Sequence, residues 1–119
     1  MDGMKTIFEG EIENLVIKAI QQNEKENHLM IALSGAIDTY NSQQFEAILN
    51  KLIQSEYNNI TFSCSMLNYI SSMGIGVFMN MLSKLKKING TITFSKVQDS
   101  VYRVFENLGF ANFFIFKET

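Results

Sequence analysis

Apolar residues recur along this chain with two spacings, and the spacing predicts where strands and helices lie. Residues 14–22 and 28–35 form two strand-like runs around the polar linker 23–27, which predicts a hairpin with a moderately long turn. Residues 59–64 alternate apolar with polar side chains, the pattern of a strand with one buried face. Because residues 14–22 and 28–35 come before any predicted helix, the order of elements is expected to begin with two strands.

Three further stretches repeat apolar residues at intervals of three and four, the period of an amphipathic helix. They are residues 42–55, 72–88 and 99–107. Asn41 or Ser42 is expected to cap the first helix, and Asn89-Gly90 to end the second in a left-handed conformation. Short apolar runs at 91–95 and 113–116 are predicted to be strands.

The predicted order of elements is β-β-α-β-α-β-α-β. Helices between strands supply the crossovers that parallel neighbours need, so we expect an α/β fold with a mixed four- to five-stranded sheet and helices packed against it. With no proline and no low-complexity linker, residues 14–119 are expected to form a single domain. Residues 1–13 are expected to be either an N-terminal tail or an extra edge strand.

Composition narrows the class of protein. A chain of 119 residues with 46% hydrophobic residues is long enough to bury one core. The net charge of −2 and the absence of a cationic stripe argue against nucleic-acid binding. The basic cluster Lys84, Lys86 and Lys87 is expected to be a solvated helix end.

No apolar run is long enough to span a membrane and no export signal is visible, so the expected location is cytoplasmic.

The residue types that usually carry catalysis are sparse. The only histidine, His28, is predicted to lie at the start of a strand in a surface or capping role. The only cysteine, Cys64, lies in a strand-like run and is expected to be a buried structural thiol. No nucleophile elbow, phosphate-binding glycine loop or cluster with metal-ligand spacing is present. We therefore expect no enzyme activity, catalytic residue, cofactor or metal.

The most informative stretch is residues 68–78, Asn-Tyr-Ile-Ser-Ser-Met-Gly-Ile-Gly-Val-Phe, where an apolar strand gives way to a helix. It places the hydroxyls of Ser71 and Ser72 at the start of that helix. From residue type alone, each serine is an ordinary N-cap that satisfies one free amide. Asp38, shortly before the first predicted helix, is by the same reasoning a turn or helix cap.

This stretch resembles the signature of the STAS domain, a family named for sulfate transporters and anti-sigma factor antagonists. Two other landmarks follow the family pattern in the right order. Residues 33–38, Leu-Ser-Gly-Ala-Ile-Asp, resemble the end of the family's second strand, and Leu108-Gly109-Phe110 is similar to the step after its third helix. The resemblance extends over about residues 15–116 and implies a STAS-like fold.

The resemblance also implies a function, that of an anti-sigma factor antagonist in a partner switch. Ser72 falls on the serine that such proteins have phosphorylated. The unphosphorylated protein would bind a GHKL-type serine kinase that also serves as the anti-sigma factor, phosphorylation would release it, and a phosphatase would reset the system. Asp38 matches an acidic residue thought to assist docking or phosphorylation.

The implied partner-binding surface comprises Asp38, Tyr69, Ser71, Ser72, Met73 and Gly74. Tyr69 and Met73 are candidates for exposed apolar anchors, although Met73 would alternatively tuck into the neighbouring loop. Gly74 is expected to let the partner backbone approach closely.

The chain departs from the family pattern in three places, one of which is the strand end Ser63-Cys64-Ser65, which lacks an acid often found there. Ser71 stands where kinase substrates often have Asp, and Met73 replaces a usually small residue. These departures keep a second hypothesis open, a STAS interaction or scaffold module that does not depend on phosphorylation.

Overall fold

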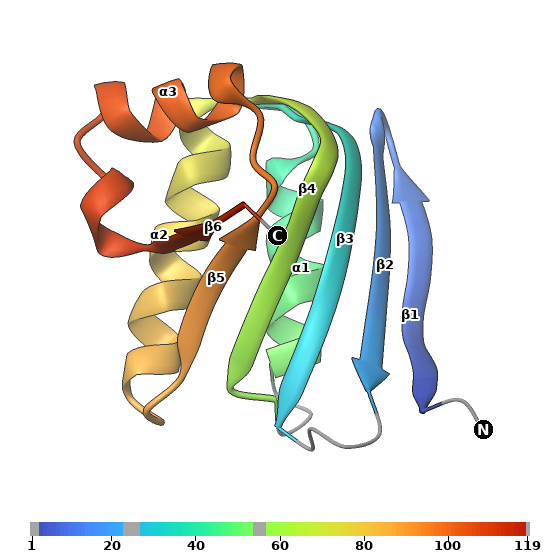
Figure 1. Ribbon diagram of the computed structural model, residues 1–119. Coiled ribbons are helices and arrows are strands. Elements are labelled where there is room, and N and C mark those ends of the chain that lie inside the picture. The colour runs from blue at the N-terminus through green and yellow to red at the C-terminus, as the bar shows by residue number, and fades with distance from the viewer. Residues whose placement is uncertain (1–2, 23–26, 54–56, 119) are drawn as a thin grey trace.

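All the strands join a single mixed sheet whose strand order follows the sequence. The computed structural model describes residues 3–22, 27–53 and 57–118. The strands are β1 (Met4–Ile12), β2 (Leu15–Gln22), β3 (His28–Ile37), β4 (Asn59–Ile70), β5 (Thr91–Ser95) and β6 (Ile115–Lys117), and the helices are α1 (Ser42–Ile53), α2 (Ser72–Lys86), α3 (Asp99–Asn107) and the 3-10 helix η1 (Ala111–Phe113). Neighbours pair antiparallel from β1 to β3 and parallel from β3 to β6. This is the predicted α/β fold, with α1 and α2 behind the sheet (Figure 1).

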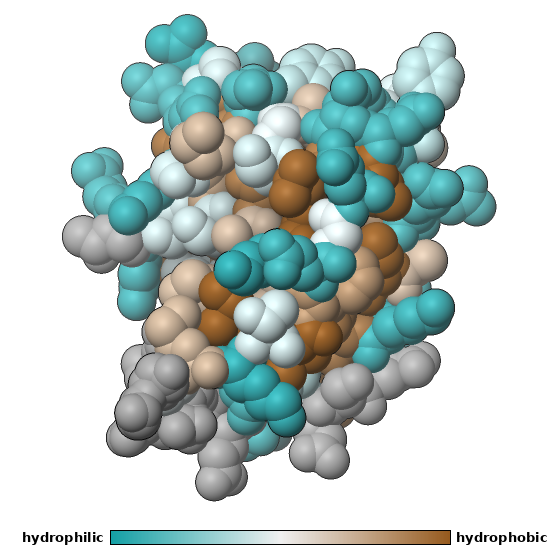
Figure 2. Space-filling model, turned by 90° about the vertical axis from the view of Figure 1, so that its right-hand side faces the viewer, coloured by the Kyte–Doolittle hydropathy of each residue, from teal (hydrophilic) through white to brown (hydrophobic). Residues whose placement is uncertain are grey.

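Within the described residues the sheet has six strands rather than the four to five expected. The additional strand is β1, which pairs with β2 from Met4 to Ile12 with one irregularity between Thr6 and Phe8. Its free edge carries hydrophilic side chains, and the view onto that edge shows them lying across apolar surface (Figure 2). Charged residues on an edge strand discourage pairing with another chain.

Strand β4 is longer than the predicted run of residues 59–64. It continues to Ile70, and its pairing with β3 shifts register between Ala32 and Ser34 and again between Gly35 and Ala36. These irregularities break the simple alternation of apolar and polar residues. The alternation therefore predicted a strand that ended at residue 64, whereas β4 continues to Ile70. As a result β3 and β4 end side by side, with Ile37 opposite Ile70.

The end of α2 lies where the sequence predicts it, whereas the last strand begins later. Residues 54–55 of the first predicted helix and 23–26 of the linker lie outside the described residues. Helix α2 ends as predicted, since Asn89 has a φ of 58° and the Gly90 amide donates to the Leu85 carbonyl oxygen at 2.7 Å. The last strand begins later than predicted, because residues 111–113 form η1 and Phe114 turns into the core.

An aromatic cluster fills the space between the helices and the sheet. Phe78 of α2 lies at its centre, and its ring is in edge-on or tilted contact with four others. These are Phe45, Phe62, Phe94 and Phe105. Cys64 is buried beside them, as predicted, and burial raises the pKa of its thiol to about 12. A thiol that stays protonated is a poor nucleophile.

Candidate functional site

The serine pair lies where β4 passes into α2, against the end of β3. The backbone amide of Ser71 donates to the Ile37 carbonyl oxygen at 2.8 Å. The Ser71 Oγ accepts a hydrogen bond from the Gly74 amide at 3.1 Å, so Ser71 is the N-cap of α2. Because Ser71 is buried, its hydroxyl has a structural role.

Ser72, in contrast, is the first residue of α2 and is exposed. The first turn of α2 contains no acidic residue. Amides in the first turn of a helix have no partner within the helix, and the positive end of the helix dipole lies there. The site therefore offers an accessible hydroxyl in a position that would stabilise an attached anion.

Asp38 follows β3 directly and lies at the same end of the sheet. Its Oδ1 accepts hydrogen bonds from the amides of Tyr40, at 2.9 Å, and Asn41, at 2.8 Å. This is an Asx-type turn that shapes the entry to α1. The carboxylate thus organises the loop next to the serine pair.

The two predicted apolar anchors are both exposed but on different faces. Met73, 53% exposed, lines a groove between α1 and α2 and does not tuck into the loop. Tyr69, 52% exposed, precedes the buried Ile70, so it points away from the helices. Met73 is therefore next to Ser72 on the helical side, whereas Tyr69 is on the opposite side of the sheet.

Gly74 has an internal role, which corrects its expected one. It is buried, and a Cβ at this position would come within 2.7 Å of Ile37 Cγ2 and 2.8 Å of Ile70 Cγ1. Its missing side chain lets α2 pack closely on β3 and β4. A partner backbone has no access to it. Gly76, rather than Gly74, faces open space and lines the groove with Met73.

Asn41 also has a role that its sequence position did not reveal. It was one of two candidate helix caps, yet its buried side chain joins separate segments. Its Nδ2 donates to the carbonyl oxygens of Glu13, at 2.7 Å, and Ala36, at 2.9 Å, and its Oδ1 accepts from the Asp38 amide at 2.9 Å. Asn41 therefore attaches the turn between β1 and β2 to the loop beside the serine pair.

The one histidine of the sequence lies far from Ser72. His28 lies at the amino end of β3, where its Nε2 is 2.8 Å from Thr61 Oγ1 on β4. Ser72 follows the carboxyl end of β4, and β3 and β4 are parallel, so the histidine and the serine lie at opposite ends of the sheet. Among the described residues, no group of three or more His, Cys, Asp and Glu side chains could hold a metal ion.

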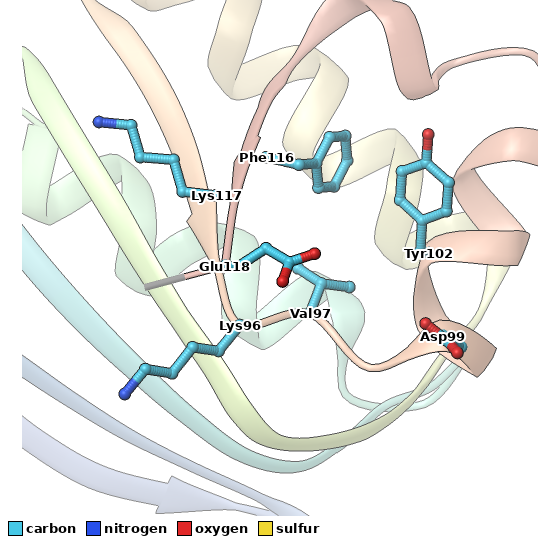
Figure 3. A pocket seen from close by; sticks show the side chains of 7 residues that line it. All are labelled: Lys96, Val97, Asp99, Tyr102, Phe116, Lys117 and Glu118. Carbon is cyan, nitrogen blue, oxygen red and sulfur yellow. The ribbon is translucent and has the colours of Figure 1, made fainter.

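A separate hollow lies next to α3 and β6 (Figure 3). It is lined by Lys96, Val97, Asp99, Tyr102, Phe116, Lys117 and Glu118. The rings of Tyr102 and Phe116 pack edge to face at 5.0 Å, and the two lysines extend away from them (Figure 3). Its two cations are matched by two carboxylates, so it shows no preference for ligand charge.

Comparison with known proteins places the chain in a family. The model of the STAS domain matches residues 19–119, so the chain belongs to the STAS domain family. BtrV from Bordetella bronchiseptica, which carries the name of an anti-sigma factor antagonist, is 28% identical over 86 residues, 72% of this chain and 74% of BtrV. The anti-sigma-B factor antagonist of Staphylococcus aureus is 23% identical over 90 residues, 76% of this chain and 83% of that protein.

Solved structures with the same fold include the anti-sigma factor antagonist SpoIIAA in its unphosphorylated form. It has a TM-score of 0.73 at 18% identity and covers 87% of this chain and 88% of its own. The phosphorylated form of SpoIIAA from Bacillus has a TM-score of 0.65 at 17% identity, covering 87% and 91%. The murine anion transporter Slc26a9 has a TM-score of 0.62 at 15% identity, covering 92% of this chain but 18% of the transporter. In the described part of this chain, no helix is long and apolar enough to cross a membrane.

The capping role of Ser71 predicts a measurable loss of stability. Ser71→Ala removes the acceptor of the Gly74 amide and should lower the free energy of unfolding by about 1 kcal/mol. Urea unfolding followed by circular dichroism measures this change. Ser72→Ala is the matched control, because Ser72 is exposed and should change stability by less than about 0.5 kcal/mol. Equal losses in the two variants would contradict the assignment of Ser71 as the cap.

Proposed function

We propose that this chain is a cytoplasmic anti-sigma factor antagonist that acts by partner switching. In its unmodified state it binds an anti-sigma factor that is also a GHKL-type serine kinase, and phosphorylation of Ser72 releases it. A phosphatase restores the binding state. The chain itself acts by binding and not by catalysis. The names of its relatives support the antagonist role, since BtrV and the S. aureus protein are both named for it.

The observation that carries the proposal is the contrast between the two serines. Ser71 is buried and its hydroxyl accepts from Gly74, whereas Ser72 is exposed at the start of α2, next to the groove that Met73 lines. Only the second hydroxyl is available to a kinase. The groove and the exposed Met73 provide apolar contact area for a protein partner at the same place.

Release on phosphorylation must arise in the complex and not within this chain. A phosphate on Ser72 would carry about −1.5 to −2 charges at the positive end of the α2 dipole, where an anion is favourable. The antagonist fold should therefore persist. In the complex, the same charge would be pressed against partner atoms that had packed around a neutral hydroxyl, which costs desolvation and repulsion.

A charge on Ser72 is expected to weaken partner binding at least tenfold, equivalent to about 1.4 kcal/mol. Ser72→Asp and the phosphorylated protein would each be titrated against the purified kinase by calorimetry. Ser83→Asp is the matched control, since Ser83 is exposed on the same helix, near its other end. Undiminished affinity of both modified forms, with full affinity of the control, would count against the switch.

The modification itself is tested in the source organism. The protein is taken from growing and from stressed cells, and its intact mass and phosphopeptides are measured, with a Ser72→Ala strain as control. A single phosphoryl group on Ser72 whose occupancy changes with growth condition supports the switch. An unmodified protein under every condition, with normal behaviour of the Ser72→Ala strain, contradicts it.

The alternative is a STAS interaction module that works without phosphorylation. Two residues favour it: Ser71 occupies the position where substrates of the kinase often have Asp, and Met73 is larger than the usual residue. A similar fold also forms a small part of a transporter, Slc26a9. In this case the Ser72→Asp variant should bind its partner as tightly as the unmodified chain does.

A further inference from the structure

Two grooves flank the amino-terminal half of α1. The first, of about 540 Å³, lies between α1 and α2 and is lined by Ser42, Gln43, Glu46, Met73, Gly76, Val77 and Asn80. The second, of about 580 Å³, lies between α1 and the turn that joins β1 to β2, and is lined by Glu13, Tyr40, Gln43, Gln44 and Ala47. Gln43 lines both grooves, so they form one continuous surface across α1. The first groove adjoins Ser72, because Met73 lines it.

The second groove is held in place by internal contacts. The Asn41 side chain donates to the Glu13 carbonyl oxygen at 2.7 Å, and the Ala36 amide donates to the Asn14 carbonyl oxygen at 2.8 Å. Gly35 lies against the same turn. The position of Glu13 relative to α1 is thus fixed by hydrogen bonds from two different segments. A partner side chain would meet a preorganised surface there.

The chemistry of the second groove indicates what it would accept. Tyr40 is 85% exposed, which leaves its ring face accessible, and Glu13 is an exposed carboxylate in the same groove. The amides of Gln43 and Gln44 add hydrogen-bond acceptors. Among the described residues that line the two grooves, none is Lys or Arg. A guanidinium group matches this set, because it stacks on an aromatic ring and pairs with a carboxylate through two parallel hydrogen bonds.

We infer that the surface which binds the anti-sigma factor extends across α1 into the second groove, where Glu13 and Tyr40 receive an arginine side chain of that partner. This inference rests on the proposed function and deepens it. Glu13 precedes residue 19, where the match to the STAS domain begins, whereas Tyr40 lies within the matched range. This contact would help one antagonist select one anti-sigma factor among several, since complementary charges contribute to specificity.

The test compares variants of the two residues in binding titrations. The probes are the purified GHKL-type serine kinases of the source organism, each titrated first with the unmodified chain. Glu13→Lys reverses the charge and should weaken binding to the recognised kinase at least tenfold. Tyr40→Ala should weaken it about fivefold to tenfold, consistent with the loss of a stacked cation. Tyr40→Phe keeps the ring and should retain the affinity.

Glu106→Lys is the control for net charge, because Glu106 is exposed on α3, away from both grooves. It should leave the affinity unchanged. Circular dichroism confirms that each variant is folded, which is expected for changes at exposed side chains. Wild-type affinity of Glu13→Lys and Tyr40→Ala would overturn the inference while leaving the switch at Ser72 intact. If no kinase binds the unmodified chain, the proposed function fails and the inference with it.

Discussion

Replacing Phe78 with alanine is expected to lower the free energy of unfolding by about 3–5 kcal/mol. The ring is fully buried, and its centroid lies 4.9 Å from those of Phe62 and Phe94. It also contacts Phe45 of α1, at 5.7 Å, and Phe105 of α3, at 6.3 Å. One side chain therefore joins α1, α2 and α3 to strands β4 and β5. Its removal would leave a cavity that none of these rigid rings can refill without moving.

Urea unfolding measures the effect of Phe78→Ala, with Phe113→Ala as the matched control. Phe113 is 52% exposed in η1, so the same chemical change there should cost less than about 0.5 kcal/mol. A loss below about 2 kcal/mol for Phe78→Ala would contradict its central position in the core, because buried phenylalanines ordinarily cost more.

Gly35→Ala is expected to destabilise the fold by about 2–5 kcal/mol, through two separate effects. The φ angle of Gly35 is 109°, a conformation that a residue with a side chain rarely adopts. An added Cβ would also lie 2.1 Å from the Asn14 carbonyl oxygen. That oxygen accepts the hydrogen bond from Ala36, so the clash would push the turn between β1 and β2 away from β3.

Gly109→Ala separates the two effects. Gly109 has a φ of 82°, but nothing lies within 4 Å of the Cβ that alanine would add. This control should therefore show only the cost of the backbone conformation, about 1–2 kcal/mol. Thermal and urea unfolding of both variants give the difference. Equal losses would mean that the close approach of Gly35 to Asn14 contributes nothing to stability.

The change at Gly35 should also reach the proposed partner surface. The turn that it supports carries Glu13, which lines the groove with Tyr40. If Gly35→Ala folds at low temperature, its affinity for the kinase should fall together with that of Glu13→Lys. The response to phosphorylation of Ser72 should persist, because Ser72 is attached to β4 and α2 and not to this turn.

The helices and the approximate strands were predictable because their signals are local. Apolar residues at intervals of three and four marked α2 and α3, and the Asn89-Gly90 pair marked the end of α2. The start of α2 at the serine pair was predictable for the same reason. These features depend on the backbone of one segment and on which of its faces is apolar.

The strand boundaries were less predictable, since pairing depends on segments far apart in the chain. β1 shows no regular alternation of apolar and polar residues, and its hydrogen bonds to β2 make it a strand. β4 continues past its alternating part because β3 pairs with it through two register shifts. The residues of β1 do not identify β2 as its partner, and the residues of β4 do not identify β3.

The candidate functional site, like the fold, was predictable only in its local features. The sequence by itself determined that two hydroxyls stand at the beginning of an amphipathic helix, since strand and helix periods meet at Ser71 and Ser72. The tertiary structure decided which hydroxyl is buried, which of Gly74 and Gly76 faces the groove, and that Tyr69 and Met73 lie on opposite sides of the sheet. The physical reason is that periodicity specifies the faces of one element, whereas exposure depends on which other elements pack against those faces.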